Sequence, residues 1–599
     1  MASDAVRMRT LLLKIVVCLA LIGCIAAIAP SRTTAADPFS EYDLAMFERP
    51  ALAVPKYEKL FPSGLMPLWI QTLDRSDAGL RRLTIDTLAI AHERGVADVQ
   101  QAKAPLIELL SQPQQDLDTV ASAARTLVVL ESIEAAQSLA DAAIERGSRI
   151  ANIVEPAFAK WKSPVLKKNW IERLDQANVT DSMLLLAIDG VGAIGAKEAD
   201  SALYRIAVDP DKQTTVRLRA AKALGAIGAS QSLSRATQLA ASDPSSKDSR
   251  VIALLVVAML SSDKSPQAIE LLGKLSADSN SVVQAASLKR LFEIDPAEVD
   301  ALADNLVASP DVNVRRHCIR AMLDNPRRER IASIAPHLDD VNPTLRREVT
   351  TGLLRWAESK ELRSEVIAQT MRVMQNDSWR SCEQACVVMA KLDHKPAGSR
   401  MVDLLGHRRG EVRVASAWGL TQLRDPQYLS DMLQHAEAVC DGFMNGQFND
   451  SMPGMSLQMA HLFVAFGDQM YAPANAVLRL YLPKNFDMGM EARSAGCWAI
   501  GLINAKEPSE ELLSMLEGRF MDTNSMEPED DGFRSMCAIA FGRMKLEDKL
   551  PDLRRSVGTG RCGQACYWAI EQMTGEKTPP IPVRRLVQED WFLAPVAIP

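Results

Sequence analysis

A short apolar pattern that recurs along most of the 599 residues limits the folds open to this chain. Residues 216–228 read Val-Arg-Leu-Arg-Ala-Ala-Lys-Ala-Leu-Gly-Ala-Ile-Gly, which predicts a helix with one apolar face at the 3.6-residue period. Gly225 and Gly228 are expected to loosen and end this helix, and its two arginines to point away from the apolar face. The pattern returns at residues 251–260, 283–291, 314–323, 345–354, 379–389, 412–420, 492–501 and 533–542.

The spacing of these copies predicts a repeat protein. From residue 216 to residue 412 the copies follow one another at roughly 31–35 residues, the period of stacked helical hairpins. Many copies follow a second amphipathic stretch, such as residues 236–241 or 332–338, and a turn rich in Asp, Pro and Ser. These features resemble the HEAT-repeat family, in the short variant shared with phycobilisome-lyase-like repeats, of an exported bacterial type. The resemblance implies an all-α fold, a right-handed superhelical α-solenoid of about a dozen HEAT-like helical hairpins.

The array is expected to occupy the middle of the chain, with different segments at its ends. The predicted segments are a signal peptide or membrane anchor at 1–36, a lead-in or cap at 37–63, the solenoid at 64–575 with an insertion near 440–459, and a tail or cap at 576–599. Because the end repeats of a solenoid expose an apolar face, the lead-in is expected to cover the first repeat. Trp591 and Phe592 could fold back over the last.

Residues 1–36 have the pattern of a targeting segment. Basic residues precede a nearly unbroken apolar run at 15–29, and Thr-Ala-Ala at 34–36 resembles a cleavage site. About 15 apolar residues are few for a membrane span, which needs about 20, so a cleaved signal peptide is favoured over an uncleaved anchor. A third alternative is a lipoprotein, because Leu-Ile-Gly before Cys24 resembles a lipobox and Cys24 would carry the lipid. All three place the body outside the cytoplasm, in the periplasm or the extracellular space, with possible membrane association.

Charge argues against nucleic acid as the partner. The formal net charge is −7, and the first 36 residues carry four basic side chains against one acidic one, which leaves −10 for the rest. An acidic body does not attract a polyanion, so a protein partner is expected.

One nucleotide-binding pattern is explained by the repeat. Residues 190–195 match G-x-G-x-x-G, and Asp209 follows at about the distance that a ribose-binding acid would have. However, Gly-Ala-Ile-Gly at 192–195 returns at 225–228, one repeat later. The glycines are therefore assigned to the ends of two repeat helices.

The ten cysteines, of which Cys18 and Cys24 lie in the leader, raise the question of metal or disulfide chemistry. The remaining cysteines fall mostly at positions where other copies carry alanine, so they are interpreted as small packing residues, with disulfides and a metal site as weaker alternatives. His394 and His407 are unsuitably spaced to complete a zinc site. The body cysteines are Cys318, Cys382, Cys386, Cys440, Cys497, Cys537, Cys562 and Cys566.

Two further features could carry contacts. The insertion at 440–459 contains Met452, Met455 and Met459, which favour a partner-binding loop or, alternatively, a copper site, since thioethers bind Cu(I). A second feature is an arginine-rich band. It is interpreted as a ladder in which turn aspartates pair with arginines, or alternatively as a concave patch for an acidic peptide or anionic polysaccharide. The band comprises Arg315, Arg316, Arg320, Arg327, Arg328, Arg330, Arg346, Arg347, Arg408, Arg409 and Arg413.

The sequence therefore predicts a non-catalytic protein-binding scaffold or adaptor that uses the concave face of its solenoid. No phosphate-binding G-K-[ST] loop, H-E-x-x-H or G-x-S-x-G motif is present, and no catalytic, cofactor or metal residue is assigned. Two alternatives remain open: a lyase- or chaperone-like factor acting on a cofactor-bearing protein, and copper handling through the methionine-rich loop.

Overall fold

The computed structural model describes residues 42–60, 64–228, 231–242, 248–447, 452–523, 526–581 and 583–587. These residues fall into two compact units. The N-terminal unit holds residues 55–334 together with 583–587, and the C-terminal unit holds 335–581 together with 42–54. The targeting segment at 1–36, and Trp591 and Phe592 of the tail, lie outside the described residues.

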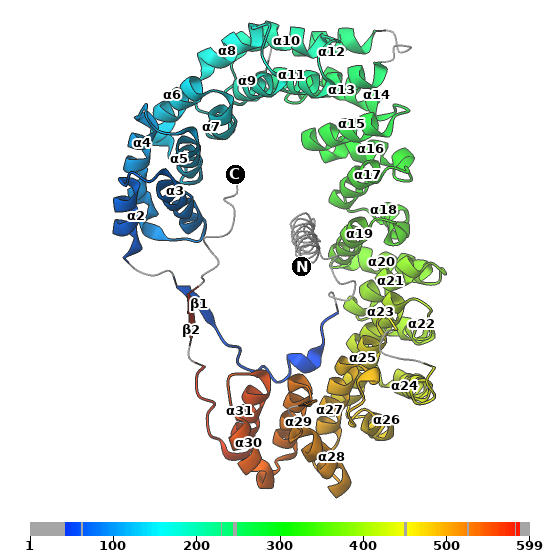
Figure 1. The fold of residues 1–599 in the computed structure, drawn as a ribbon. Coiled ribbons are helices and arrows are strands. Elements are labelled where there is room, and N and C mark those ends of the chain that lie inside the picture. The colour runs from blue at the N-terminus through cyan, green and yellow to red at the C-terminus, as the bar shows by residue number, and fades with distance from the viewer. Residues whose placement is uncertain are drawn as a thin grey trace, which may run out of the picture. The chain divides into compact units, whose positions relative to one another are not determined.

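Each unit is a stack of helical hairpins, which confirms the all-α solenoid (Figure 1). In the N-terminal unit one layer, here called inner, contains α3 (Ala78–Glu93), α5 (Leu117–Val129), α7 (Ser148–Trp161), α9 (Asp181–Ala193), α11 (Thr214–Ala226), α13 (Ser249–Met259), α15 (Ser281–Ile294) and α17 (Val312–Asp324). The outer layer contains α2 (Leu65–Leu73), α4 (Lys103–Ser111), α6 (Ala136–Arg146), α8 (Lys167–Asp175), α10 (Asp200–Val208), α12 (Ser232–Ala240), α14 (Pro266–Ser276), α16 (Pro296–Leu306) and α18 (Arg328–Ile334).

The C-terminal unit continues the same arrangement. Its inner layer contains α19 (Pro343–Trp356), α21 (Trp379–Lys391), α23 (Gly410–Leu423), α25 (Met455–Asp468), α27 (Met490–Ile503), α29 (Asp531–Met544) and α31 (Arg561–Thr574). Its outer layer contains α20 (Lys360–Met374), α22 (Gly398–Leu404), α24 (Leu429–Met444), α26 (Asn475–Leu480), α28 (Glu510–Phe520) and α30 (Leu550–Ser556). Short 3₁₀ turns, such as η5 (Ala335–Asp339), connect many of these helices.

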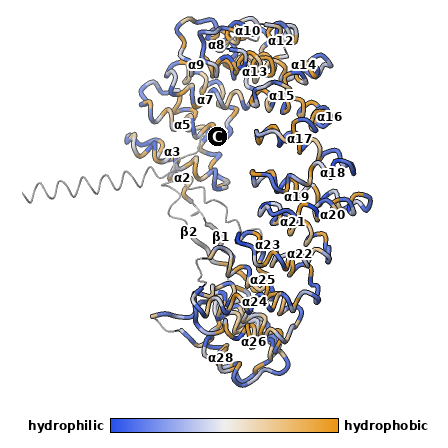
Figure 2. The backbone as a smooth tube through the Cα atoms, turned by 90° about the vertical axis from the view of Figure 1, so that its right-hand side faces the viewer, coloured by the Kyte–Doolittle hydropathy of each residue, from blue (hydrophilic) through white to orange (hydrophobic). Residues whose placement is uncertain are grey.

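The repeat pattern sets the ends and the buried face of each inner helix. In α11 the side chains of Val216, Ala220 and Leu224 are at most 1% exposed, as the 3.6-residue period predicts. Several inner helices begin at an aspartate whose carboxylate accepts a hydrogen bond from a first-turn amide, for example Asp77 from the amide of Leu80. Figure 2 shows the amphipathic pattern: hydrophobic and hydrophilic residues alternate along the helices. Within the described part of the chain, no helix is both long enough and apolar enough to span a bilayer.

Two local features differ from the sequence analysis. The inserted loop shrinks to the residues between Met444 and Met455, since α24 and α25 extend into it from both sides. A two-stranded parallel sheet, β1 (Tyr57–Leu60) with β2 (Arg584–Val587), joins distant parts of the chain in the N-terminal unit and was not anticipated.

Candidate protein-binding surface

One position of the repeat lies on the inner surface of both units. In the N-terminal unit it holds Lys222 and Lys289, which line a groove. In the C-terminal unit it holds Trp418 and Trp498, whose indole N–H groups donate hydrogen bonds to residues of the lead-in. The same scaffold position therefore carries a lysine in two repeats of one unit and a tryptophan in two repeats of the other.

Five positions earlier in the repeat, an arginine holds the turn that precedes five of the inner helices. These five side chains are at most 8% exposed, which for Arg217 corrects the expectation that it points away from the packed face. They donate to main-chain carbonyls, which would otherwise be buried without partners. The bonds run from Arg217 to Ala207, Arg315 to Ser309 and Pro310, Arg346 to Asp340, Arg413 to His407, and Arg493 to Pro483.

The lead-in, defined here as residues 42–50, lies on the inner layer of the C-terminal unit (Figure 1). At its start the Tyr42 ring lies 5.6 Å from the Trp418 ring, and the Trp418 indole N–H donates to the Asp43 carboxylate at 3.1 Å. Next, η1 (Ala45–Phe47) packs on α27 and leaves Met46 only 1% exposed. The lead-in thus begins with a ring contact, a carboxylate contact and a buried thioether.

Arg49 makes the densest set of contacts in the lead-in. Its guanidinium forms two hydrogen bonds, at 2.8 and 2.9 Å, with the carboxylate of Asp468 at the end of α25. Its carbonyl accepts hydrogen bonds from the Trp498 indole at 2.5 Å and from Arg543 of α29 at 3.2 Å. A bidentate arginine–carboxylate pair is charge-assisted and directional, so this cluster fixes the register of the segment.

Arg561 of α31 forms the last contact. It donates to the Phe47 carbonyl at 3.1 Å and lies 4.2 Å from the Phe47 ring centre. Burial lowers the pKa of Arg561 and lowers that of Arg543 to about 10. Both guanidiniums remain charged near neutral pH, and their N–H groups meet main-chain oxygen atoms, which any peptide offers.

Residues 42–50 therefore lie on the C-terminal unit, which differs for this part of the segment 37–63 from the expected cap over the first repeat. The lead-in binds α23, α25, α27, α29 and α31, because its aromatic, acidic and arginine side chains find partners there. Sequence reasoning missed the surface, although one signal was present. Trp418 and Trp498 occupy the position where residues 216–228 have Lys222, and large aromatic side chains at an inner-surface position are typical of binding sites.

A second surface lies in the N-terminal unit. A groove of about 500 Å³ runs over α11, α13 and α15. Its lining combines apolar side chains such as Leu218 and Val257 with the basic side chains of Lys222 and Lys289. It therefore offers a cationic, partly apolar surface.

The predicted arginine band is largely used inside the repeats. Arg315, Arg346 and Arg413 are buried in the arginine ladder, and Arg327 and Arg330 pair with the buried Asp300 on α16. These five arginines therefore stabilise turns and helix pairs, through main-chain carbonyls and the helix residue Asp300 where the ladder interpretation expected turn aspartates, and they do not form one exposed basic patch.

The cysteines of the body are buried and free, which agrees with their interpretation as packing residues. Cys497 of α27 and Cys537 of α29 lie with their sulfur atoms 3.7 Å apart. Burial raises the pKa of the Cys537 thiol well above its ordinary value, with a further contribution from Cys497, so the thiol stays protonated. Among the described residues, no group of three or more His, Cys, Asp or Glu side chains is placed to hold a metal ion.

The methionine-rich loop is corrected. Met455 and Met459 belong to α25 and are at most 3% exposed, so they pack in the core instead of forming an accessible ligand set. Pro453 is also structural, since its carbonyl accepts a hydrogen bond from Arg413 at 2.8 Å. Two of the three methionines that could bind copper are therefore buried in the core of the C-terminal unit.

The glycines at 190–195 serve helix packing, as predicted. Gly190 lies in α9, where an added Cβ would lie 2.5 Å from the Trp170 ring, and Gly192 allows close approach to Ala223. Gly195 has a φ of +67° at the end of the helix. These contacts account for the nucleotide-binding pattern without a nucleotide.

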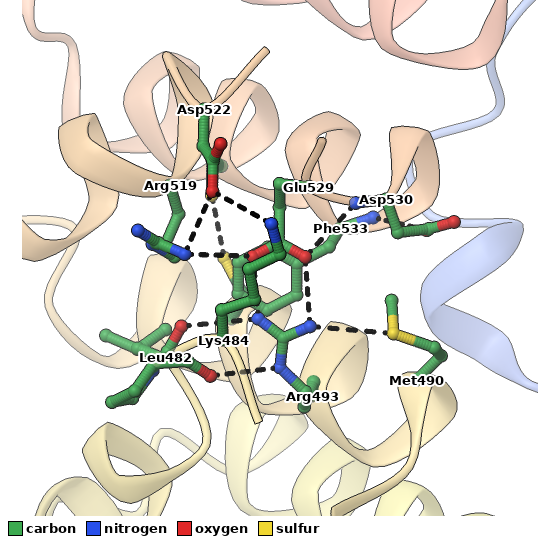
Figure 3. Close-up of polar contacts among 12 residues, drawn as sticks. Leu482, Lys484, Met490, Arg493, Arg519, Asp522, Glu529, Asp530 and Phe533 are labelled. Atoms are coloured by element: carbon green, nitrogen blue, oxygen red, sulfur yellow. Dashed lines mark hydrogen bonds and ion pairs between the residues drawn. The ribbon is translucent and has the colours of Figure 1, made fainter. Parts of the chain in front are cut away.

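A buried ion pair joins α27 to the segment that precedes α29. Glu529 has a fully buried side chain that accepts two hydrogen bonds from the equally buried Arg493, at 2.8 and 2.9 Å (Figure 3). Arg519 lies 3.6 Å from the same carboxylate, and Asp522 binds Arg519. Burial alone would raise the pKa of Glu529, but the bonds and charge of Arg493, with smaller contributions from the Asp530 amide and Arg519, lower it below 4.5.

Comparison with known proteins adds a likeness of fold. Solved structures similar to this chain include Kap95p with RanGDP (TM-score 0.49, 14% identity, 85% of this chain and 72% of that chain) and importin beta (0.45, 13%, 84% and 72%). Kap121p bound to Pho4p is a third (0.49, 12%, 85% and 57%). No family model and no curated protein matches the sequence. Likeness at this level carries no argument about function.

Proposed function

We propose that this protein is a non-catalytic scaffold outside the cytoplasm that binds a protein partner on the inner surface of its C-terminal unit. The observation that carries the proposal is the lead-in itself. The surface already holds a peptide segment through Trp418, Asp468, Trp498, Arg543 and Arg561, using both side-chain and main-chain contacts. A surface that binds one segment in this way has the chemistry needed to bind another.

Site-specific photo-crosslinking tests the choice of surface. A photo-crosslinking amino acid is placed at Arg424, which is 63% exposed beside Asp468, and in a control protein at Arg555, which is 73% exposed on the outer helix α30. We expect one protein to crosslink repeatedly from position 424 and not from position 555. Equal crosslinking from the two positions, or crosslinking from 555 alone, would contradict the proposed surface.

The location outside the cytoplasm rests on residues 1–36, with their basic start, apolar run and Thr-Ala-Ala sequence. Mass spectrometry of the amino terminus of the protein from its native envelope fraction tests this part. Cleavage predicts a mature protein that begins at Asp37, whereas lipidation predicts one that begins at a modified Cys24. Recovery of the intact chain from the cytoplasmic fraction would refute export.

A further inference from the structure

We propose that the lead-in is an internal ligand that occupies the partner-binding surface, and that the partner enters with a segment of the same chemistry. This inference rests on the proposed function. The expected partner segment carries a carboxylate, then a methionine followed by an aromatic residue, then an arginine, as Asp43, Met46, Phe47 and Arg49 do here. The partner competes with the lead-in for one site.

The surface has a distinct receptor group for each part of this pattern. The Trp418 indole N–H donates a hydrogen bond to the carboxylate of Asp43. The Asp468 carboxylate accepts hydrogen bonds from both terminal nitrogens of Arg49. Arg543 and Arg561 bind carbonyls, whose positions depend on the path of the main chain and not on the side chains. Side chains thus select the segment, while the main-chain contacts hold any segment that follows the same path.

The lead-in is also placed so that a partner segment can replace it. The Asp43 and Glu48 residues are exposed, the Arg49 side chain is 43% exposed, and Val54, just beyond the lead-in, is 76% exposed. By contrast, the receptor residues stand on inner helices that pack against one another without the lead-in. A competitor can therefore replace the lead-in contact by contact while the solenoid remains folded.

The test is a binding competition in the full-length protein. The probe is a fluorescein-labelled peptide of residues 41–52, and fluorescence anisotropy measures its affinity. Arg49→Glu places a carboxylate opposite Asp468 and should release the lead-in. Lys56→Glu is the matched control, because it makes the same charge change at an exposed residue outside the lead-in. Far-UV circular dichroism checks that each variant keeps its helices.

We expect the Arg49→Glu protein to bind the probe at least 10-fold more tightly than the wild type, and Lys56→Glu to match the wild type. Adding Asp468→Asn to Arg49→Glu should weaken probe binding at least 10-fold, because the carboxylate that receives the arginine is lost. Equal affinity of wild type and Arg49→Glu for the probe, or no effect of Asp468→Asn, would overturn the inference.

Two further outcomes separate this inference from the proposed function. If the partner crosslinks from position 424 equally well in wild type and Arg49→Glu, the surface binds a partner but the lead-in does not compete. If isotope-mixed wild-type protein shows crosslinks from the lead-in of one copy to position 424 of another, the lead-in acts between chains and internal occupancy is wrong.

Discussion

The buried pair of Arg493 and Glu529 allows a sharp test of how neighbouring repeats are joined. The change is Glu529→Gln, which keeps the size of the side chain and removes its charge. Arg493 would then remain fully buried and bonded to the carbonyls of Leu482 and Pro483, without the charge of Glu529 that faces it, while Asp522 would still pair with Arg519 (Figure 3). An unneutralised charge in this position should weaken the contact between α27 and α29.

The cost follows from the burial of both groups. Removing one partner of a buried ion pair costs about 3–5 kcal/mol, because the remaining charge is left without compensation. Glutamine keeps one oxygen that can accept from Arg493, which favours the low end of that range. A loss of about 3 kcal/mol corresponds to a rise of about 100-fold in the equilibrium constant for local opening.

Hydrogen exchange measured by mass spectrometry is the suitable assay, since a repeat array opens in parts and has no single unfolding transition. Amides of α27 and α29 should exchange about 100-fold faster in Glu529→Gln, while those of α9 and α11 keep their rates. Glu270→Gln is the control, because Glu270 and its partner Lys274 are both about two-thirds exposed on one helix. This control should leave exchange unchanged throughout the chain.

The same pair predicts the direction of a pH effect. Because the folded-state pKa of Glu529 lies below its ordinary value of 4.5, its contribution to stability is fully present above pH 4.5 and is lost as the pH falls through the lower folded-state pKa.

Two results of the exchange experiment would refute this account of the ion pair: unchanged exchange in α27 and α29 of Glu529→Gln, or an equal acceleration in α9 and α11. In either case the pair would not be what joins these two repeats.

Two other predictions concern packing and a buried histidine. Gly225→Leu should cost about 1–3 kcal/mol, since an added Cβ would lie 2.1 Å from the Ser261 hydroxyl. Amides of α11 and α13 should exchange faster in Gly225→Leu, while the control Gly273→Leu, with nothing within 4 Å, should exchange like the wild type. Equal acceleration by the two substitutions would refute the packing argument. Burial lowers the pKa of His461 to about 4. As the pH falls from 6.5 to 4, the histidine is therefore protonated in the unfolded chain but not in the folded one. The free energy of unfolding should decrease by about 3 kcal/mol over this range. Hydrogen exchange of α25 in His461→Gln should lose this part of the pH dependence, and an unchanged dependence would contradict the argument.

The hairpins could be predicted from the sequence because helix periodicity is local. The apolar residues of 216–228, such as Val216 and Leu224, are those that the helix buries, and the glycines of 190–195 and 225–228 do stand at the ends of successive inner helices. Where a charge sits was harder to predict. Arg217 is buried because the Ala207 carbonyl, ten residues earlier, accepts its N–H, and this geometry exists only in the folded hairpin.

The candidate surface could not be predicted from local sequence patterns, because its contacts join residues that are far apart in the chain. Asp43 and Trp418 are 375 residues apart, and neither has a neighbour in sequence that reveals the contact. The pair of Arg493 and Glu529 is intermediate, since its separation of 36 residues is close to one repeat. Aligning each acidic residue with the ladder arginine of the preceding copy would have identified Glu529 as a buried partner.

The arrangement of the repeat explains how one solenoid can carry two different inner surfaces. The ladder position of Arg217 and Arg493 holds the preceding turn through main-chain carbonyls, so its chemistry is fixed by the fold. The position five residues later lies on the inner surface instead: Lys222 lines the groove, and the Trp498 indole donates to the Arg49 carbonyl of the lead-in. Substitutions there change what the surface binds without removing the bonds that hold the turns. A cationic groove over α11–α15 and an aromatic, peptide-holding surface over α23–α31 can therefore be built on the same repeat.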